Sequence, residues 1–246
     1  MEIFDRLIET VSDARVIGVE VGLFWTMVMI EQEGKVKSGL AATLTNPEWE
    51  HARYPAVEEA GRLENRSALE LAHLVYSQSY TETGIGLATI NALLPPVHHF
   101  VDLPAEEYII RHGKDKKVAL IGHFPFVSQL KNQVKELWVL ELHPQGEDLP
   151  ASMAPEIIPQ ADILAITATT LINHTFESVF NLRKQGAKVL LLGPSTPLSP
   201  LLFDFGIDVL SGSLVENSER ILPLIRQGAT FRQIRPNGVR LVTIES

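Results

Sequence analysis

The chain has 246 residues, of which 45% are hydrophobic and 21% charged; it contains no cysteine and carries a formal charge of −9 at pH 7. These proportions are typical of a globular protein, and the absence of cysteine excludes a disulfide framework, a thiolate metal site and a cysteine nucleophile. The acidic balance argues against a nucleic-acid-binding protein, because such proteins present a positively charged face to the phosphates.

Residues 1–99 are predicted to form a small α+β domain. Apolar residues spaced by three and four positions predict an amphipathic helix over Met1–Val11. Runs rich in β-branched and large apolar residues then predict an antiparallel meander of three strands, at Arg15–Val21, Phe24–Glu31 and Ser38–Leu44.

The second part of this domain is predicted to be helical after a long loop. The stretch Asn46–Arg66 is polar, holds two prolines and is typical of a loop. Ser67-Ala68-Leu69-Glu70 is a capping box, so a helix is expected to begin there and to run to about Tyr76. A further helix is expected over Glu82–Leu94, where Pro95-Pro96 ends it.

Residues 100–246 have a different hydrophobic pattern, in which short unbroken apolar runs are separated by segments long enough to form helices. Such runs are typical of parallel strands buried on both faces, at Val118–Ile121, Leu137–Leu140, Ile163–Ile166, Val189–Leu192 and, more weakly, Ile207–Leu210. The intervening helices are expected at Phe126–Val134, His174–Gln185 and Glu216–Gln227, and a late edge strand at Val239–Ile244. The pattern predicts a Rossmann-like, doubly wound parallel sheet and therefore an α/β fold for this domain.

Polar residues and glycines follow four of the predicted strands. The segments are Gly122-His123-Phe124-Pro125, Glu141-Leu142-His143-Pro144, Thr167 to Thr175, and Gly193-Pro194-Ser195-Thr196-Pro197. In an open parallel sheet, ligands bind beyond the carboxyl ends of the strands, so we expect a site at this edge. Gly122 lacks the second and third glycines of a dinucleotide fingerprint, which disfavours classical NAD binding.

His123, Glu141 and His143 are the most notable ionisable groups at this edge, and all follow the first two predicted strands. Imidazole and carboxylate together suit zinc, iron or nickel, and they equally suit acid–base catalysis near neutral pH. The alternative is a solvent-exposed polar strand end. His98-His99 is a poor chelator, because successive side chains of an extended linker point to opposite sides.

The neutral polar segments have two interpretations each. Gly193–Pro197 could bind an anion through hydroxyls and free amides, or it could be a proline-rich turn that caps a helix. Thr167–Thr175 could hydrogen-bond a polar ligand, or it could cap the next helix. Gly84 and Gly86, near the start of the helix expected over Glu82–Leu94, predict close approach of a backbone or a ligand, or a simple turn.

These motifs, in this order and spacing, resemble the family of putative heavy-metal chelation proteins. The resemblance runs through Gly84-Ile85-Gly86-Leu87-Ala88 to Leu93, Val118–Pro125, Thr167–Thr175 and Leu192–Pro197, and so covers nearly the whole chain. It implies an enolase N-terminal-like domain over 1–99, a Rossmann-like domain over 100–246 and a site between them. It further implies that this site handles a metal ion or a metal-chelating, pterin-like small molecule.

The resemblance also implies which residues line the cleft. The first domain would contribute Gly84, Gly86 and Asn91. The second would contribute Gly122, His123, Phe124, Pro125, Glu141, Thr167, Thr170, Asn173, Thr175, Gly193, Ser195 and Thr196. Ala168 and His174 stand where small, glycine-like residues are expected, so the third loop departs from the family pattern.

Two classes of function follow from these residues. One is an enzyme acting on a small anionic or chelating molecule, with His123 and Glu141 as catalytic groups. The other is a non-catalytic carrier of a metal or metal chelate, favoured because neutral Thr, Ser, Asn and backbone donors outnumber ionisable groups in the predicted cleft. His123, Glu141 and His143 are the candidate metal ligands. A homodimer is the expected assembly.

A membrane segment is not expected. The longest apolar stretch, Val21–Ile30, is far shorter than the roughly 20 residues that span a bilayer. The first residues include Glu2, Asp5 and Arg6 rather than a basic segment followed by an apolar core. The sequence therefore predicts a cytoplasmic protein.

Overall fold

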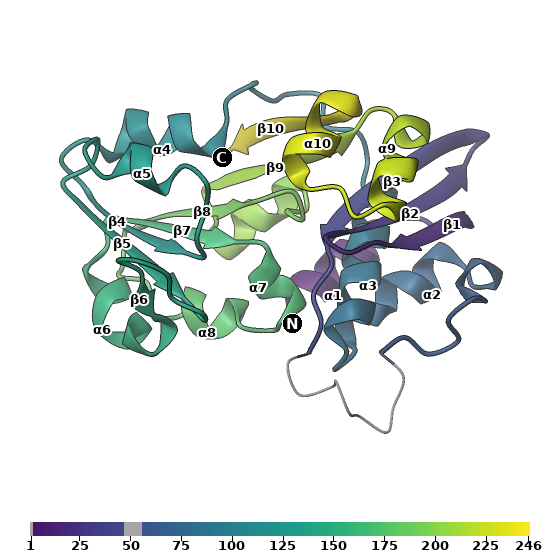
Figure 1. Cartoon of the computed structure of the whole chain (residues 1–246), viewed down its shortest axis with the longest axis horizontal. Helices are drawn as coiled ribbons and strands as arrows, with labels where there is room; N and C mark the ends of the chain where they lie inside the picture. Colours follow the sequence, from purple (N-terminus) through teal and green to yellow (C-terminus); the bar gives the residue numbers. More distant parts are fainter. Residues whose placement is uncertain (1, 47–55) are drawn as a thin grey trace.

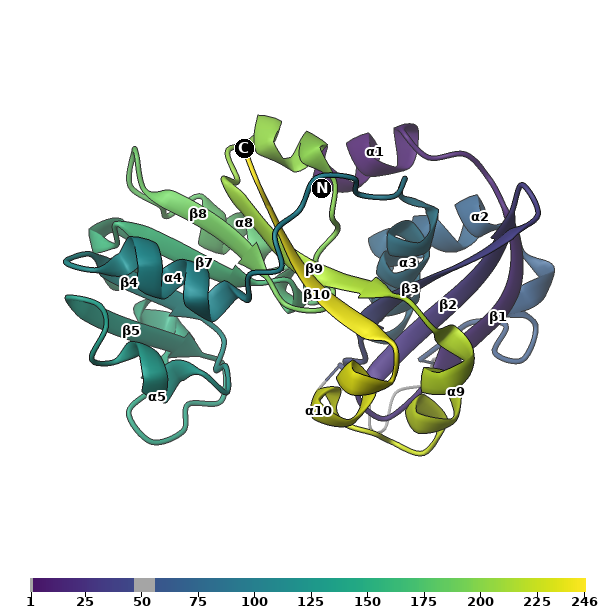
Figure 2. The ribbon, with the colours of Figure 1, turned by 90° about the horizontal axis from the view of Figure 1, so that it is seen from above.

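Two β-sheets form the framework of the protein in the computed structural model, which describes residues 2–46 and 56–246 (Figure 1). A three-stranded antiparallel sheet belongs to the N-terminal unit, residues 2–94, and a seven-stranded, mostly parallel sheet belongs to the C-terminal unit, residues 100–246. Seen from above, β9 and β10 extend from the large sheet towards the small one (Figure 2). The predicted α/β fold class is confirmed.

The N-terminal unit contains a helix, a meander of three strands and two further helices. Its elements are α1 (Glu2–Glu9), β1 (Arg15–Val21), β2 (Trp25–Gln32), β3 (Lys35–Ala42), α2 (Ala68–Ala72), the 3₁₀ turn η3 (His73–Tyr76) and α3 (Tyr80–Leu93). Strand β3 begins earlier than predicted, because Glu33 and Gly34 both have positive φ and form a tight two-residue turn. Part of the predicted loop, residues 47–55, lies outside the described residues.

Local capping determines where the helices of this unit begin. The Ser67 hydroxyl accepts from the Glu70 amide at 3.2 Å, and the Glu70 carboxylate accepts from the Ser67 amide at 2.7 Å. The predicted capping box is therefore confirmed. Helix α3 begins two residues before the predicted position, after its N-cap Ser79, and 12 of its 14 residues are buried.

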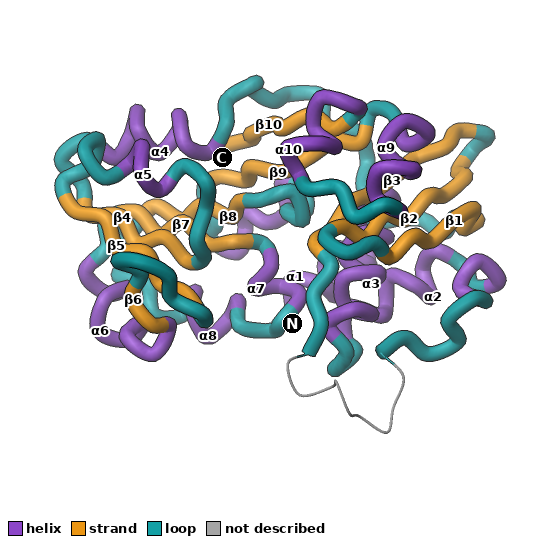
Figure 3. The backbone as a smooth tube through the Cα atoms, viewed as in Figure 1, coloured by secondary structure: helices purple, strands orange, loops and turns teal. Residues whose placement is uncertain are grey.

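The C-terminal unit alternates strands with short helices (Figure 3). Its elements are α4 (Ala105–Gly113), β4 (Lys117–Ile121), α5 (Val127–Leu130), β5 (Glu136–Glu141), β6 (Leu149–Pro150), α6 (Ala154–Ile157), β7 (Ile163–Thr167), α7 (Thr169–Ile172), α8 (Phe176–Phe180), β8 (Lys188–Leu192), β9 (Val209–Val215), α9 (Ser218–Arg226), α10 (Phe231–Ile234) and β10 (Val239–Glu245). Helices α4 and α5 lie on one face of the sheet and α6 and α8 on the other (Figure 1).

The strand order of the large sheet is β10-β9-β8-β7-β4-β5-β6. The six strands from β4 to β9 are parallel to their neighbours, and β10 joins β9 antiparallel. The chain thus starts in the middle at β4, builds outward through β5 and β6, and then restarts at β7 on the other side. This is the 3-2-1-4-5-6 order of a doubly wound sheet, whose order reverses between β4 and β7.

Several predicted helices of this unit are wrong in extent. Of the predicted helix over His174–Gln185 only α8 forms, and His174, whose left-handed φ of 60° interrupts a helix, separates α8 from the preceding α7. The predicted helix over Phe126–Val134 is the single turn α5. Helix α4 and strand β6 were not predicted, and the fifth run begins as a strand at Val209 rather than Ile207.

One hydrophobic cluster runs through both units. It joins Phe4, Leu71 and Ile85 of the N-terminal unit to Leu164 and Leu191 of the large sheet. The two units therefore share a core. Within the described part of the chain, no helix has both the length and the apolar character needed to cross a bilayer.

Candidate functional site

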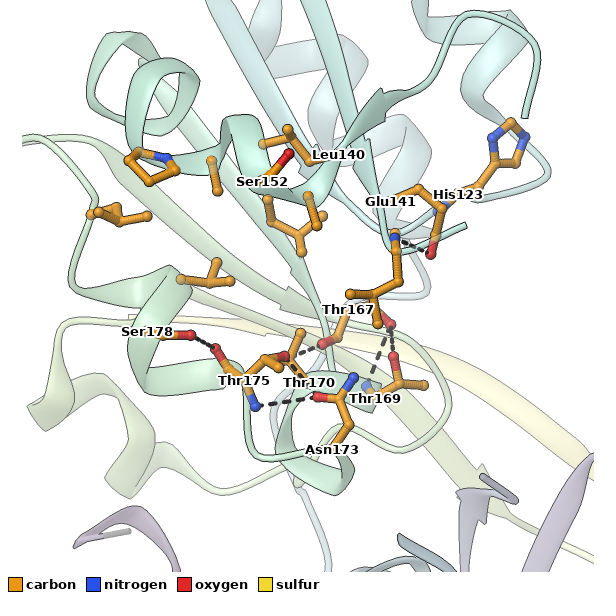
Figure 4. A pocket seen from close by; sticks show the side chains of 18 of the residues that line it. His123, Leu140, Glu141, Ser152, Thr167, Thr169, Thr170, Asn173, Thr175 and Ser178 are labelled. Carbon is orange, nitrogen blue, oxygen red and sulfur yellow. Dashed lines mark hydrogen bonds between the residues drawn. The ribbon is translucent and has the colours of Figure 1, made fainter. Parts of the chain in front are cut away.

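A cavity of about 610 Å³ opens at the carboxyl ends of β4, β5 and β7 (Figure 4). We call it the switch-point pocket, because β4 and β7 are the strands between which the sheet order reverses. Such a crevice is the usual ligand position in a doubly wound sheet, and the volume lies within the range of small-molecule sites. The lining residues are Ile121, Gly122, His123, Phe124, Leu140, Glu141, Leu142, Ala151, Ser152, Ala154, Pro155, Thr167, Thr169, Thr170, Asn173, Thr175, Ser178, Val179 and Leu182.

One wall of the pocket is a connected group of hydroxyls and an amide. The Thr167 and Thr169 hydroxyls lie 3.0 Å apart, and the Thr170 hydroxyl donates to the Thr167 carbonyl at 2.7 Å. Asn173 Oδ1 accepts from the Thr175 hydroxyl at 2.7 Å. Within the described residues Asn173 Nδ2 makes no hydrogen bond, so this wall offers a free donor beside hydroxyls that can still accept. The remaining lining residues are largely apolar and form what we call the apolar wall, which includes Leu140, Leu142, Ala154 and Pro155.

Gly122 allows the chain to turn tightly from β4 beside the end of β7. Its φ is +97°, and a Cβ at this position would lie 3.1 Å from Thr167 Cγ2. A side chain here would be strained and would press on the hydroxyl wall. The glycine thus keeps the floor of the pocket open.

Glu141 is the last residue of β5 and places a carboxylate at the pocket. One carboxylate oxygen accepts from the His123 amide at 2.8 Å and the other accepts from the Leu142 amide at 2.8 Å. Two main-chain donors therefore fix the carboxylate in position and tie the ends of β4 and β5 together.

His123 is held by a carboxylate that the sequence did not single out. Its Nδ1 lies 2.9 Å from Asp148, whose side chain is only 4% exposed and also accepts from the Gln145 amide. Since a carboxylate only accepts, Nδ1 carries the proton, and in the neutral ring Nε2 holds the free lone pair. The ring is 45% exposed and lies away from the threonines (Figure 4).

His123 and Phe124 also border a second cavity of about 420 Å³, which includes the predicted residue Pro125. This cavity lies beside β5 and α5, where Trp138 and Lys131 contribute to its lining. The loop from His123 to Pro125 therefore separates two hollows.

The predicted three-residue metal site is not formed. β5 ends at Glu141 and the chain bends away, so His143 is exposed and does not line the pocket. The His123 ring bonds Asp148 rather than turning to Glu141. Among the described residues, which include all three, no group of three or more His, Asp or Glu is arranged to hold a metal ion.

The predicted cleft residues of the N-terminal unit lie away from this pocket. Gly84 and Gly86 are inside α3, where a Cβ at Gly86 would come within 2.5 Å of the Val75 amide. Asn91 Nδ2 donates to the carbonyls of Leu40 at 3.0 Å and Ser195 at 3.1 Å. The two glycines thus approach the backbone of their own unit, and Asn91 joins the two units. The expected single cleft lined by all of the predicted residues is therefore corrected.

Gly193, Ser195 and Thr196 follow β8 and do not line the pocket, and Ser195 contacts the N-terminal unit. The Ser195 hydroxyl accepts from the Ala42 amide at 2.8 Å. A smaller cavity of about 230 Å³ between the units is lined by Asn91 and Thr196. Asn91 Oδ1 and Thr196 Oγ1 are buried without a hydrogen-bond partner among the described residues, and a ligand between the units stays a prediction for this smaller cavity.

The departure of the third loop from the family pattern has a structural reason. His174 has φ 60°, a conformation that a glycine adopts without strain. Its Nε2 lies 2.8 Å from the Ser77 carbonyl of the N-terminal unit, so the histidine fastens this loop to the other unit.

Several lining residues were missed by the sequence reasoning. Thr169 lies inside one of the predicted polar segments, whereas Ser152 and Ser178 have no motif around them. The same holds for Asp148, which lines the second cavity and positions His123. Thr169 could have been predicted because it lies just after a strand. The other residues come close to the site only when the chain folds.

Two family models with the same description match this chain, and an uncharacterized protein is similar to it over most of its length. Residues 105–243 match a family described as "Putative heavy-metal chelation", and residues 4–94 match a second family with the same description. An uncharacterized protein of Methanocaldococcus jannaschii is 28% identical over 224 residues, which cover 88% of this chain and 85% of that protein.

Two solved structures have the same fold over their whole length. A protein of unknown function from Desulfitobacterium hafniense is 27% identical, with a TM-score of 0.84 over 100% of this chain and 98% of that one. One from Pyrococcus horikoshii is 23% identical, with a TM-score of 0.84 over 99% and 98%. Both are described as members of the family that matches residues 105–243. The chain therefore belongs to the family described as "Putative heavy-metal chelation".

Proposed function

We propose that this protein binds a small, metal-chelating organic molecule in the switch-point pocket, rather than a bare metal ion. The observation that carries the proposal is the lining itself: apolar side chains share a cavity of about 610 Å³ with a group of hydroxyls and one amide. Such a lining suits a planar heterocycle, whose faces contact aliphatic groups and whose edges exchange hydrogen bonds.

The donor set does not suit a metal held by protein side chains alone. Transition metals take three or four imidazole, carboxylate or thiolate ligands, and no group of three or more His, Asp or Glu among the described residues provides them. A metal associated with this protein would therefore arrive with an organic chelator. Pterin-like compounds belong to this class.

The charge of the pocket does not favour a strongly anionic ligand. Among the described residues that line it, none is Lys or Arg, and Glu141 is acidic. A neutral or weakly charged molecule would bind without leaving a buried anion unpaired.

Catalysis is a second candidate, favoured by the His123–Asp148 pair. A neutral imidazole with Nδ1–H bonded to a buried carboxylate presents Nε2 as a proton acceptor beside the pocket. If the bound molecule is a substrate, His123→Ala should abolish its turnover and leave its affinity almost unchanged. A variant with unaltered turnover would remove this candidate.

The binding proposal is tested with pterin itself, whose fluorescence reports binding. Ser178→Trp places a large side chain at the pocket from the exposed face of α8, and Glu177→Trp is the matched control on the neighbouring exposed position outside the lining. We expect pterin, alone or with Zn²⁺, to bind the unaltered protein and Glu177→Trp but not Ser178→Trp.

Native mass spectrometry of the protein purified without chelator complements the titration. An organic compound retained by the unaltered protein and absent from Ser178→Trp supports the proposal. Stoichiometric Zn²⁺ or Ni²⁺ without an organic compound, retained equally by both variants, would contradict it.

A further inference from the structure

Glu141 occupies a distinctive place in the strand order. Gly122 follows the first strand of the doubly wound sheet, β4, and Glu141 ends the second, β5. In dinucleotide-binding sheets of this order, an acidic residue at this point, roughly 20 residues after the glycine turn, accepts hydrogen bonds from ribose hydroxyls. Glu141 has the same position and lines the cavity that opens there.

The local geometry leaves the Glu141 carboxylate able to take two more donors. Each oxygen accepts one main-chain amide at 2.8 Å, from His123 on one side and Leu142 on the other. A carboxylate has about four acceptor positions, so each oxygen retains one. Two acceptors held side by side match two adjacent hydroxyl groups on a ligand.

The groups that would hold a diphosphate are not at this site. His123 and Phe124 replace the glycines that let a backbone approach phosphates, and α5 is a single turn. No Lys or Arg is present among the described lining residues. Glu141 is therefore present at a site that has no phosphate-binding groups among the described lining residues.

The apolar wall lies next to the carboxylate in the same cavity. Leu140 and Leu142 flank Glu141 in the sequence, and all three residues line the pocket together with Ala154 and Pro155. A heterocycle against this wall would place a substituent of a few atoms at Glu141.

From this arrangement, and building on the proposed function, we infer that the ligand carries a vicinal diol whose two hydroxyls bind Glu141. The diol belongs to a ribose or to a polyhydroxylated side chain on the heterocycle, without a diphosphate.

The test measures, by calorimetry, the affinity of the unaltered protein for two matched sets of compounds. Adenosine is compared with 2′-deoxyadenosine and 3′-deoxyadenosine, and neopterin with 6-methylpterin, which lacks the hydroxylated side chain. We expect the diol compound of at least one set to bind, and its partner without the diol to bind at least about tenfold more weakly. Adenosine would identify a ribose, and neopterin a side-chain diol.

A variant then assigns the effect to the carboxylate. Glu141→Gln keeps the size of the side chain but turns one acceptor into a donor, so the preference for the diol should disappear. Circular dichroism and thermal unfolding show whether the variant is folded, and the comparison of compounds on the unaltered protein stands without it.

The outcomes separate this inference from the proposed function. Equal affinities within both sets overturn the inference, as does binding by none of these compounds. Binding by 6-methylpterin alone, abolished by Ser178→Trp, overturns the diol and leaves the proposed function standing. Diol-dependent binding that Ser178→Trp does not affect overturns both, because the diol would then be bound elsewhere.

Discussion

The two ends of the parallel strands use similar polar groups for different purposes. At the amino end, Asp162 accepts the Lys117 amide at 2.9 Å and also bonds the Lys184 ammonium, and Asp208 accepts the Val189 amide at 2.7 Å. At the carboxyl end, Glu141 likewise accepts main-chain amides, but it faces a cavity of about 610 Å³. Main-chain partners therefore do not distinguish a carboxylate with a structural role from one that a ligand can reach, whereas open volume beside the carboxylate does.

The carboxyl end is itself divided. Beyond β4, β5 and β7 it borders the switch-point pocket, and beyond β8 it is covered by the N-terminal unit through Ser195 and Asn91. Substitutions in the covered part should change stability without changing binding at the switch-point pocket, and substitutions in the open part should change that binding.

The largest loss of stability is expected in the covered part, from Asn91→Ala. This change removes the donor to two carbonyls, of Leu40 and Ser195, and should lower the free energy of unfolding by about 3 kcal/mol. Urea denaturation measures it, and pterin affinity should be unchanged. Asn181→Ala on the surface is the control, and a weakened pterin affinity in Asn91→Ala would show that the division is wrong.

At the amino end, Asp162→Asn should lower stability by about 1.5 kcal/mol at pH 7, because the charge that bonds Lys184 is lost. The hydrogen bond from the Lys117 amide, together with Lys184, lowers the pKa of Asp162 in the folded protein. The stabilisation is therefore present above the unfolded pKa of about 3.9 and is lost as the pH falls through the lower folded value.

Unfolding measured against pH checks this expectation. The difference between the unaltered protein and Asp162→Asn should shrink only below about pH 4. The exposed Asp204→Asn should show no such difference, and a gap that stays constant down to the lowest pH would contradict the assignment.

At the second cavity, Asp148→Asn should lower the free energy of unfolding by about 1 kcal/mol, since the buried carboxylate loses its charge-assisted bond to His123. The ¹⁵N NMR spectrum of the His123 imidazole tests the same contact more directly, because it shows which ring nitrogen carries the proton. We expect the tautomer protonated at Nδ1 in the unaltered protein and a mixture of tautomers in the variant. An identical spectrum in both would mean that Asp148 does not orient the ring.

The smallest change in stability, under about 0.5 kcal/mol, is expected from Thr169→Val in the open hydroxyl wall. Pterin affinity should nevertheless fall several-fold. The adjacent Thr170→Val is the matched comparison, because its buried hydroxyl donates to the Thr167 carbonyl and its loss should cost about 1 kcal/mol. If Thr169→Val left pterin affinity intact, the hydroxyl wall would not contact the ligand.

The framework could be predicted because it depends on local patterns. The four unbroken apolar runs are β4, β5, β7 and β8, and the Ser67–Glu70 capping box starts α2 where expected. Gly86 signalled a close approach correctly, although the approaching group is the backbone at Val75 and not a ligand.

The division of the site could not be predicted, because it depends on how the units dock. Nothing next to Ser195 in the sequence shows that Ala42 covers it, and nothing next to Asp148 shows that it returns to His123. The left-handed conformation of His174 could not be predicted either, because the residue contacts the Ser77 carbonyl of the other unit.

Helix α3 has a consequence for how the protein unfolds. It is buried on nearly every side, packed against β2, β3, α2 and α7, and so close to β3 that a methyl group at Gly39 would lie 2.0 Å from the Ala88 carbonyl oxygen. A helix without a solvent-facing side cannot persist once its neighbours leave. Although two family matches divide the sequence, the shared core makes the chain a single cooperative unit, expected to melt in one transition rather than in two steps.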